Sequence, residues 1–170
     1  MRLELENLEK VGNFEHVYRP EELPLDEGDL RLIEPVSVSG RLLRSAGEIE
    51  IAGELRTRVE TPCARCLKTV AIPIRADFSE RFVTAVSWRS EEQHELASED
   101  LNLAVFEGDA IDLDHLVREE ILLEVPAQVL CRQECRGLCP VCSLDRNASA
   151  CECEARQIDP RWAKLKELQS

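Results

Sequence analysis

The stretch EIEIAGELRTRVETPCARCLKTVAIPIRADFSERFV, residues 48–83, decides the fold. Both halves alternate apolar and polar residues, the pattern of β-strands that bury one face. The apolar positions are Ile49, Ile51, Leu55 and Val59 in the first half and Val70, Ile72, Ile74 and Phe82 in the second. Between them, Thr61-Pro62-Cys63 begins a turn, and a connection this short joins antiparallel strands. The stretch therefore predicts two neighbouring antiparallel strands.

The preceding run, VSVSGRLLRS, residues 36–45, alternates in the same way around Val36, Val38 and Leu42. Gly40 and Ala46-Gly47 read as bends or turns. Gly53 predicts a β-bulge, and Pro73 predicts an edge position or an irregularity in its strand. The region from Leu32 to Val83 therefore predicts an antiparallel β-meander, either an open sheet or a partial barrel.

The hydrophobic period becomes helical over residues 112–125. The residues on one face of this segment are Leu113, Leu116, Val117, Ile121 and Glu124. Asp112 is a suitable N-cap and Pro126 ends the helix, which we expect to cover the sheet. Residues 87–104 are polar and acidic and predict a solvated loop at the surface. A short helix is expected in DPRWAKLKELQ, residues 159–169, with Asp159 as its cap.

These patterns predict an α+β fold with two parts. Residues 1–130 form the antiparallel sheet domain with its covering helix, and residues 131–170 form a cysteine-rich, zinc-ribbon-like end with the terminal helix. The 170 residues are enough for one sizeable domain with a small appendage. No signal peptide opens the sequence and no stretch approaches the length of a membrane span, so a cytoplasmic protein without a membrane partner is expected.

Six of the eight cysteines lie in CRQECRGLCPVCSLDRNASACEC, residues 131–153. In a reducing compartment, closely paired cysteines indicate metal ligands more readily than disulfides. Chain geometry favours two ions, one held by a local site and one by a long-range site. The local site is Cys139, Cys142, Cys151 and Cys153, and the long-range site is Cys63, Cys66, Cys131 and Cys135. In a second arrangement one ion binds among the six late cysteines and the early pair stays free.

Four cysteines complete a tetrahedral zinc shell and leave no position for water or substrate, which is typical of structural sites. Iron–sulfur clusters also accept four thiolates, but the GLCPVC turn and the close Cys151-x-Cys153 pair favour zinc. Cys63 and Cys66 could instead form a redox pair or remain unliganded. A thioredoxin-like pair sits at the start of a helix, however, whereas the segments that flank this pair are strand-like.

Nothing in the sequence supports an enzyme or a small-molecule substrate. The three histidines, His16, His94 and His115, are scattered, and no glycine-rich phosphate loop is present. The acidic pairs are typical of solvated surfaces.

Taken together, PCARCL, AIDLDHLVREEILLEVP, CRQECRGLCPVC, CEC and DPRWAKLKEL resemble the YceD family, the large ribosomal RNA subunit accumulation proteins, over residues 35–168. The resemblance implies a non-enzymatic role in the accumulation of large-subunit ribosomal RNA and in the biogenesis of that subunit. One departure is SLDRNAS, residues 143–149, where the family often has Gly and an Asn-Leu-Asn turn. We therefore expect this loop of the local site to differ in shape.

Charge limits how such a protein could contact RNA. The net charge is −13, whereas residues 131–170 carry seven Lys and Arg against six Asp and Glu. Any RNA contact is therefore expected at the cysteine-rich end, through Arg132, Arg136 and Arg146. A large-subunit assembly protein or ribosomal protein is an equally suitable partner. The competing functions are a thiol redox protein or sensor that uses Cys63 and Cys66, and a metal-stabilised adaptor without a ribosomal link.

Overall fold

The computed structural model describes residues 1–4, 10–25, 28–45, 48–85, 88, 103–106, 108 and 110–153. By its internal contacts the chain divides into two compact units. The first unit contains Met1–Thr61 and Ala71–Ala127, and the second contains Pro62–Val70 and Gln128–Ser170. The early cysteine turn thus groups by contacts with the cysteine-rich end. The boundary between residues 130 and 131 stays a prediction about which parts fold independently.

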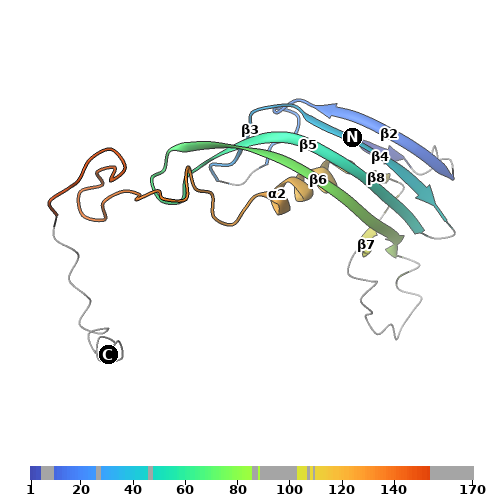
Figure 1. Ribbon diagram of the computed structural model, residues 1–170. Coiled ribbons are helices and arrows are strands. Elements are labelled where there is room, and N and C mark those ends of the chain that lie inside the picture. Colours follow the sequence, from blue (N-terminus) through green and yellow to red (C-terminus); the bar gives the residue numbers. More distant parts are fainter. Residues whose placement is uncertain are drawn as a thin grey trace, which may run out of the picture. The chain divides into compact units, whose positions relative to one another are not determined.

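The main sheet contains six described strands in the order β2-β4-β5-β6-β7, and β3 also pairs with β5 (Figure 1). These strands are β2 (Val11–Tyr18), β3 (Arg31–Leu32), β4 (Val36–Arg44), β5 (Glu48–Pro62), β6 (Thr69–Thr84) and β7 (Leu103–Phe106). β2, β4 and β5 pair antiparallel in chain order, as a meander requires. Within the described part of the chain the sheet is open and helix α2 (Leu113–Glu124) packs with it, which confirms the α+β class.

Strand β7 departs from a pure meander because it pairs with β6 in parallel, from Arg81 opposite Leu103 to Thr84 opposite Phe106. The connection between these strands is long enough for the crossover that a parallel pair needs. Leu103 and Ala104 were expected in the surface loop but belong to this strand. The rest of that loop lies outside the described residues, apart from Trp88.

Two glycines face each other across β4 and β5, where Gly40 pairs with Gly53 in an unbroken register. The expected bulge at Gly53 and bend at Gly40 are therefore wrong. A Cβ atom on Gly40 would lie 2.7 Å from Cζ of Phe14, and one on Gly53 would lie 2.9 Å from Cζ of Phe78. Aromatic rings from β2 and β6, the strands that flank this pair, thus occupy the space over the glycines, and this contact helps to explain why both positions lack a side chain.

Pro73 is exposed and lies in β6, at a distance along the strand from the four residues that pair with β7. Among the described residues this part of β6 has a neighbour on one side, β5. A residue without an N–H group is tolerated at such an edge. The pairing of the described residues is compatible with the edge position predicted for Pro73.

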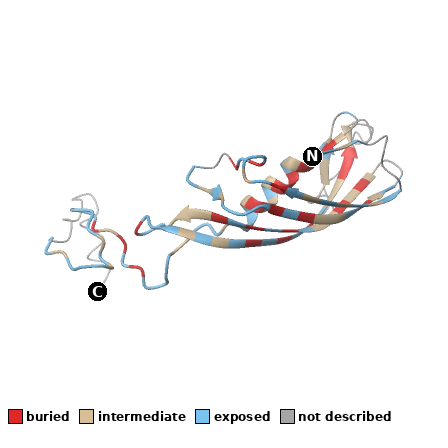
Figure 2. Ribbon diagram, turned by 90° about the horizontal axis from the view of Figure 1, so that it is seen from above, coloured by how far each residue is buried: buried red, intermediate tan, exposed pale blue. Residues whose placement is uncertain are grey.

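Helix α2 spans Leu113–Glu124, and Asp112 is its N-cap. The side chain of Asp112 accepts a hydrogen bond of 3.0 Å from the N–H of Asp114. Leu113, Leu116, Val117 and Ile121 are buried, whereas Glu124 is exposed. The buried helix residues belong to one apolar core with the inward-facing residues of the sheet. Figure 2 shows buried and exposed positions alternating along the strands, the pattern expected from the sequence.

A small antiparallel ribbon joins β1 (Arg2–Glu4) to β8 (Ala110–Asp112), next to the start of α2. Neither β1 nor β2 was predicted. In β2, Val11 and Val17 are exposed to solvent. The apolar residues of this strand therefore lie on both of its faces and do not give the alternating pattern that predicts a strand. The predicted terminal helix, residues 159–169, lies outside the described residues.

Candidate metal centres

The eight cysteine sulfurs lie in two groups of four, and within each group all sulfurs are within 4.8 Å of one another. The long-range site contains Cys63, Cys66, Cys131 and Cys135, and the local site contains Cys139, Cys142, Cys151 and Cys153. Both groups lie in the second unit. Spacing in the sequence favoured the same division. The second arrangement, with Cys63 and Cys66 apart from the late cysteines, does not match the positions of the sulfurs.

The two Cys-x-x-Cys turns have the same backbone geometry. In the early turn, the N–H of Cys63 donates to the carbonyl of Lys68 at 2.8 Å, and the N–H of Leu67 donates to the carbonyl of Cys63 at 3.0 Å. In the late turn, Cys139 donates to Leu144 at 2.8 Å and Ser143 donates to Cys139 at 2.9 Å. The residue after the second cysteine is left-handed in both, with φ of 61° at Leu67 and 58° at Ser143. The structure thus contains two copies of one knuckle.

Sulfur spacing at the long-range site fits a single tetrahedral ion. Sγ of Cys63 lies 3.9 Å from Sγ of Cys135, and Sγ of Cys66 lies 3.6 Å from Sγ of Cys131. Four thiolates at about 2.3 Å from one zinc ion lie about 3.8 Å apart. An iron–sulfur cluster distributes its thiolates over different iron atoms and needs a wider arrangement. The geometry therefore suits one tetrahedral ion better than a cluster.

N–H groups point at the sulfurs in both knuckles. The N–H of Cys131 lies 3.4 Å from Sγ of Cys63, and the N–H of Val141 lies 3.5 Å from Sγ of Cys139. Backbone N–H groups, those of Arg65 and Cys131 foremost, lower the pKa of Cys63 to about 6. Those of Cys142 and Val141 lower the pKa of Cys139 to about 6 in the same way.

Other thiols of the same groups shift in the opposite direction. Desolvation, followed by the neighbouring thiols, raises the pKa of Cys131 to about 12. The Cys142 thiol, followed by desolvation, raises the pKa of Cys153 to about 12. Four adjacent thiols cannot all ionise by themselves because the first thiolates repel further negative charge. A bound dication removes that conflict, so the donor sets fit a metal ion in both groups.

Burial distinguishes the two sites. At the long-range site, Cys63, Cys66 and Cys135 are buried, and Val70, Leu130 and Leu138 pack against them. At the local site, Cys142 and Cys153 are exposed. Solvent therefore reaches the local site more readily than the long-range site.

Backbone contacts hold the early knuckle against the late chain within the second unit. Ala64 donates its N–H to the carbonyl of Val129 at 2.8 Å, and Leu138 donates to the carbonyl of Arg65 at 3.0 Å. Residues 127–130 lie beside the early turn but form no strand, because Pro126 precedes them and the single hydrogen bond from Ala64 makes no ladder.

Gly137 makes the closest of these approaches. Its φ is 69°, and a Cβ atom there would lie 2.7 Å from the carbonyl oxygen of Arg65. Only glycine combines this left-handed backbone with so close a contact. Gly137, which precedes the late knuckle, therefore allows the late knuckle to lie close to the early knuckle.

The sequence pattern described as "Large ribosomal RNA subunit accumulation protein YceD" matches residues 51–169. The chain belongs to the YceD family. No solved structure matches the chain.

Relatives of this YceD-family chain occur in bacteria and in a plant. YlbN of Bacillus subtilis is 31% identical over 156 residues, which cover 91% of this chain and 86% of that protein. Rv2926c of Mycobacterium tuberculosis is 34% identical over 69% of this chain and 54% of its own length. A chloroplastic protein of Zea mays, named as a YCED homolog for large ribosomal RNA subunit accumulation, is 28% identical over 73% of this chain. The chain spans about half the length of the mycobacterial and maize relatives.

The arginines predicted to contact RNA are all exposed in this YceD-family chain, but they are not equally free. Arg132 donates from Nη2 to Oδ1 of Asn147 at 2.9 Å. The side chains of Arg136 and Arg146 make no hydrogen bond or ion pair with the described residues. Arg65, which sequence reasoning did not single out, donates from Nη1 to the carbonyl of Cys135 at 2.8 Å. The sequence could have indicated a role for Arg65, because this residue lies inside the early Cys-x-x-Cys motif.

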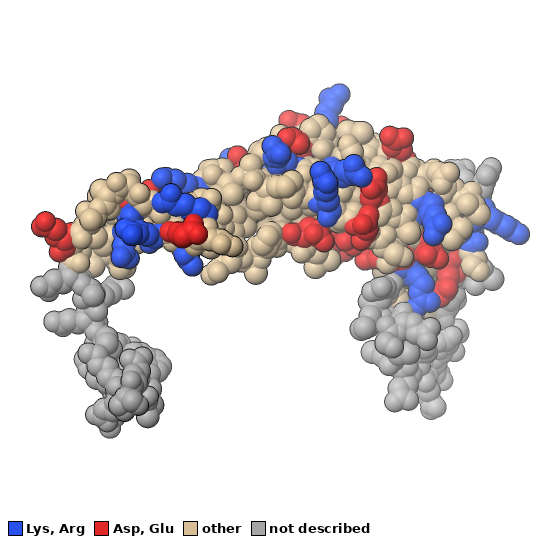
Figure 3. All heavy atoms as spheres, in the orientation of Figure 1, with Lys and Arg blue, Asp and Glu red and all other residues tan. Residues whose placement is uncertain are grey.

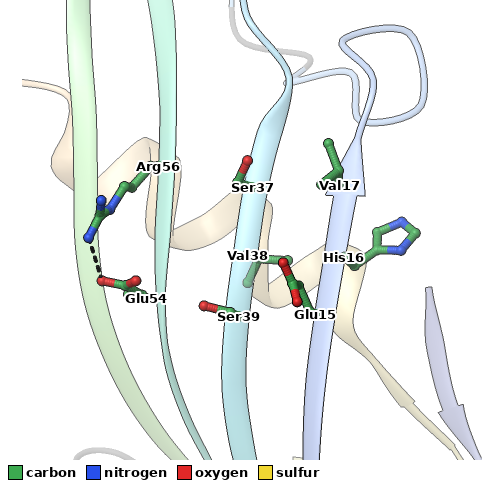
Figure 4. Close-up of a pocket in the computed structure, with 8 residues that line it drawn as sticks. All are labelled: Glu15, His16, Val17, Ser37, Val38, Ser39, Glu54 and Arg56. Atoms are coloured by element: carbon green, nitrogen blue, oxygen red, sulfur yellow. Dashed lines mark hydrogen bonds and ion pairs between the residues drawn. The ribbon is translucent and has the colours of Figure 1, made fainter.

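A separate hollow of about 310 Å³ lies on the sheet across β2, β4 and β5 (Figure 4). Arg56 and Glu54 form an ion pair of 3.0 Å there, and Ser37 and Ser39 lie nearby. His16 projects away from the serines in Figure 4, and its ring packs edge-on against Tyr18 at 4.3 Å between centroids. This histidine is therefore not positioned as a base for Ser37 or Ser39.

The described residues include no helix that is both long and apolar enough to cross a membrane. His115 is exposed on α2, and its Nδ1 atom lies 3.2 Å from Oε2 of Glu119. His94 lies outside the described residues.

Proposed function

We propose that this chain is a non-enzymatic cytoplasmic factor that supports the accumulation of large-subunit ribosomal RNA and the biogenesis of the large subunit. Membership of the YceD family is the observation that carries the proposal, since the matched region, residues 51–169, includes all eight cysteines. The name of the maize relative describes the same role. Its partner would be precursor ribosomal RNA or a protein of large-subunit assembly.

The metal in this proposal is structural zinc, with one ion in each group of four cysteines. Four thiolates fill the coordination shell of zinc and leave no position at which water or substrate could react. Sulfur distances of 3.6 and 3.9 Å support one ion at the long-range site, and the approach of all four sulfurs to within 4.8 Å of one another supports one at the local site. The metal would therefore hold the second unit in its folded form, which has few apolar residues of its own.

The net charge of the second unit with zinc in both sites favours RNA contacts with individual side chains over a broad electrostatic attraction. In the described part of the second unit, five Lys and Arg side chains stand against three Asp and Glu, a net charge of +2. Each zinc ion with four thiolates adds about −2. Figure 3 shows basic side chains gathered on one face of this unit with acidic ones among them. RNA would therefore bind through individual arginines, with Arg136 and Arg146 the most available.

An RNA-retention experiment tests the direct contact. Neutralising Arg132, Arg136 and Arg146 together to Gln should abolish retention of large-subunit RNA and reduce the salt slope by roughly 0.7–0.9 per lost phosphate contact. The matched control replaces Arg31, Arg41 and Arg75, three exposed arginines on the sheet strands, and should bind RNA as the parent does. Equal losses in both triple variants would indicate a general charge effect and contradict the proposed contact surface.

A protein adaptor in large-subunit assembly is the second candidate function, and the negative charge of two filled sites supports it. In that case the parent would capture basic ribosomal or assembly proteins without retaining RNA at low salt. Redox use of Cys63 and Cys66 is less suited to the geometry, because both sulfurs are buried and each has a late cysteine as its neighbour. Rapid alkylation of this pair in metal-loaded protein would reverse that preference.

A further inference from the structure

The side chain of Asn147 uses its full hydrogen-bonding capacity inside the second unit. Nδ2 donates to Oδ1 of Asp145 at 2.7 Å and to Sγ of Cys135 at 3.4 Å. Oδ1 accepts from Nη2 of Arg132 at 2.9 Å and from the N–H of Arg136 at 2.8 Å. An asparagine amide has two donors and two acceptor positions, so every one is occupied. Three of these partners belong to residues 132–136, the segment that contains Cys135, a ligand of the long-range site.

Asn147 itself belongs to the local site by its position in the chain. It lies between Cys142 and Cys151, so an ion at the local site closes the loop that carries it. Inside this loop the N–H of Asn147 donates to Oδ1 of Asp145 at 2.9 Å, and the N–H of Ala148 donates to the carbonyl of Asp145 at 3.0 Å. These bonds shape the middle of the loop, whereas its far end at Cys151 depends on the ion.

We propose that Asn147 couples the two metal sites. An ion at the local site fixes the loop, the loop holds the amide of Asn147 against Sγ of Cys135, and this hydrogen bond strengthens metal binding at the long-range site. The inference rests on the metal binding proposed above but not on any contact with RNA. A donor next to a ligand sulfur stabilises the thiolate and fixes its orientation, and loss of such a partner typically weakens metal binding 10–100-fold.

Coupling of this kind is reciprocal, since a free energy that links two sites acts on both. An ion at the long-range site should hold residues 131–135, and through Asn147 this segment should favour the closed form of the local loop. The two sites should therefore fill cooperatively. Loss of metal from the more exposed local site should also loosen metal at the buried site.

Cadmium provides a probe that follows the two sites separately. Each tetrathiolate site gives its own ¹¹³Cd resonance, which the full-length variants Cys63→Ser and Cys139→Ser assign. Competition with a chelator then measures the affinity of the long-range site. Asn147→Ala should weaken it roughly 10–100-fold. Arg146→Ala, in the same loop, removes a side chain without a described partner and should have no effect.

A double-variant cycle tests the coupling itself. Cys139→Ser should weaken the long-range site about as much as Asn147→Ala does, and the two changes together should weaken it no further. If the effects of Cys139→Ser and Asn147→Ala simply add, or if Asn147→Ala alone leaves the affinity within about twofold, the proposal is wrong.

Asn147→Asp keeps the oxygen that accepts from Arg132 and Arg136 but lacks the amide donor, so it separates the two halves of the side chain. It should bind cadmium at the long-range site as weakly as Asn147→Ala. Full affinity in this variant would overturn the proposal even if Cys139→Ser failed to fold. Fewer than two ions in the parent would contradict the two metal sites, whereas two ions with an unaffected Asn147→Ala would contradict only the coupling.

Discussion

Nζ of Lys68 lies 2.7 Å from Oδ2 of Asp145, so the early knuckle is joined to the loop of the local site by an ion pair. The hydrogen bond from Lys68, followed by those from the N–H groups of Asn147, lowers the pKa of Asp145 to about 2. Asp145 is therefore charged throughout the pH range in which thiolates bind metal. Its carboxylate organises both the loop and the contact with the early turn.

The two partners of this ion pair should differ in importance. Asp145→Ala loses the bond to Lys68 and two bonds from Asn147, whereas Lys68→Ala loses a single contact of a side chain that is 62% exposed. Exposed ion pairs contribute little by themselves. We expect faster chelator-driven metal release from Asp145→Ala and little change from Lys68→Ala. Equal release rates would show that the bonds to Asn147 are unimportant.

Metal content tests the division of the cysteines. Protein purified without added metal should contain two zinc ions per chain. Cys139→Ser should retain one ion and loosen the local site. Cys63→Ser should also retain one ion but should be less stable, because the long-range site closes a long loop between the early turn and residues 131–135. Elemental analysis gives the ion count, and thermal unfolding ranks the two variants.

The left-handed residues of the knuckles should prefer glycine. Leu67 has a φ of 61° and its exposed fraction is 64%, so Leu67→Gly removes backbone strain and little buried apolar area. We expect it to raise the free energy of unfolding by about 1 kcal/mol. Leu67→Ala keeps the strain and is the control, which should gain nothing. Ser143→Gly should behave like Leu67→Gly if the two turns are equivalent.

The glycine pair of the sheet should not tolerate a methyl group. A Cβ atom on Gly53 would lie 2.4 Å from the carbonyl oxygen of Ser39, so Gly53→Ala should lower the free energy of unfolding by about 1–3 kcal/mol. Gly12 lies in strand β2 with no atom within 4 Å of an added Cβ atom. Gly12→Ala should therefore be nearly neutral in the same denaturant titration. Similar losses in both variants would contradict the packing argument.

Tyr18 should make stability depend on alkaline pH. Burial, followed by the charge of Asp112, raises the pKa of this phenol to about 12, and its hydroxyl has no hydrogen-bond partner among the described residues. The folded state keeps the proton longer than the unfolded state, whose phenol titrates near 10, so stability should fall as the pH rises from 10 towards 12. Tyr18→Phe should lack this dependence. Because the chain has one tyrosine, its phenolate absorbance reports the folded pKa directly.

Periodicity revealed the strands that bury one face and the helix, but not the edges of the sheet. β4, β5 and β6 have alternating buried residues, and α2 has its apolar stripe, so their hydrophobic patterns were sufficient. β2 has exposed valines on its outer face, and β7 is only four residues long. Gly40 and Gly53 were misread because the aromatic rings that pack over them come from other strands.

The sequence by itself determined the meander, the covering helix and a set of eight cysteines at knuckle spacing, because period and spacing are local properties of the chain. Only the tertiary structure decided which sulfurs meet, that both knuckles share one backbone geometry, and that Asn147 lies against Cys135. Those relationships depend on backbone contacts such as that between Ala64 and Val129, which join segments more than sixty residues apart. Local sequence patterns do not specify where the early turn lies relative to the late cysteines. The composition of each metal site is therefore determined only when the chain has folded.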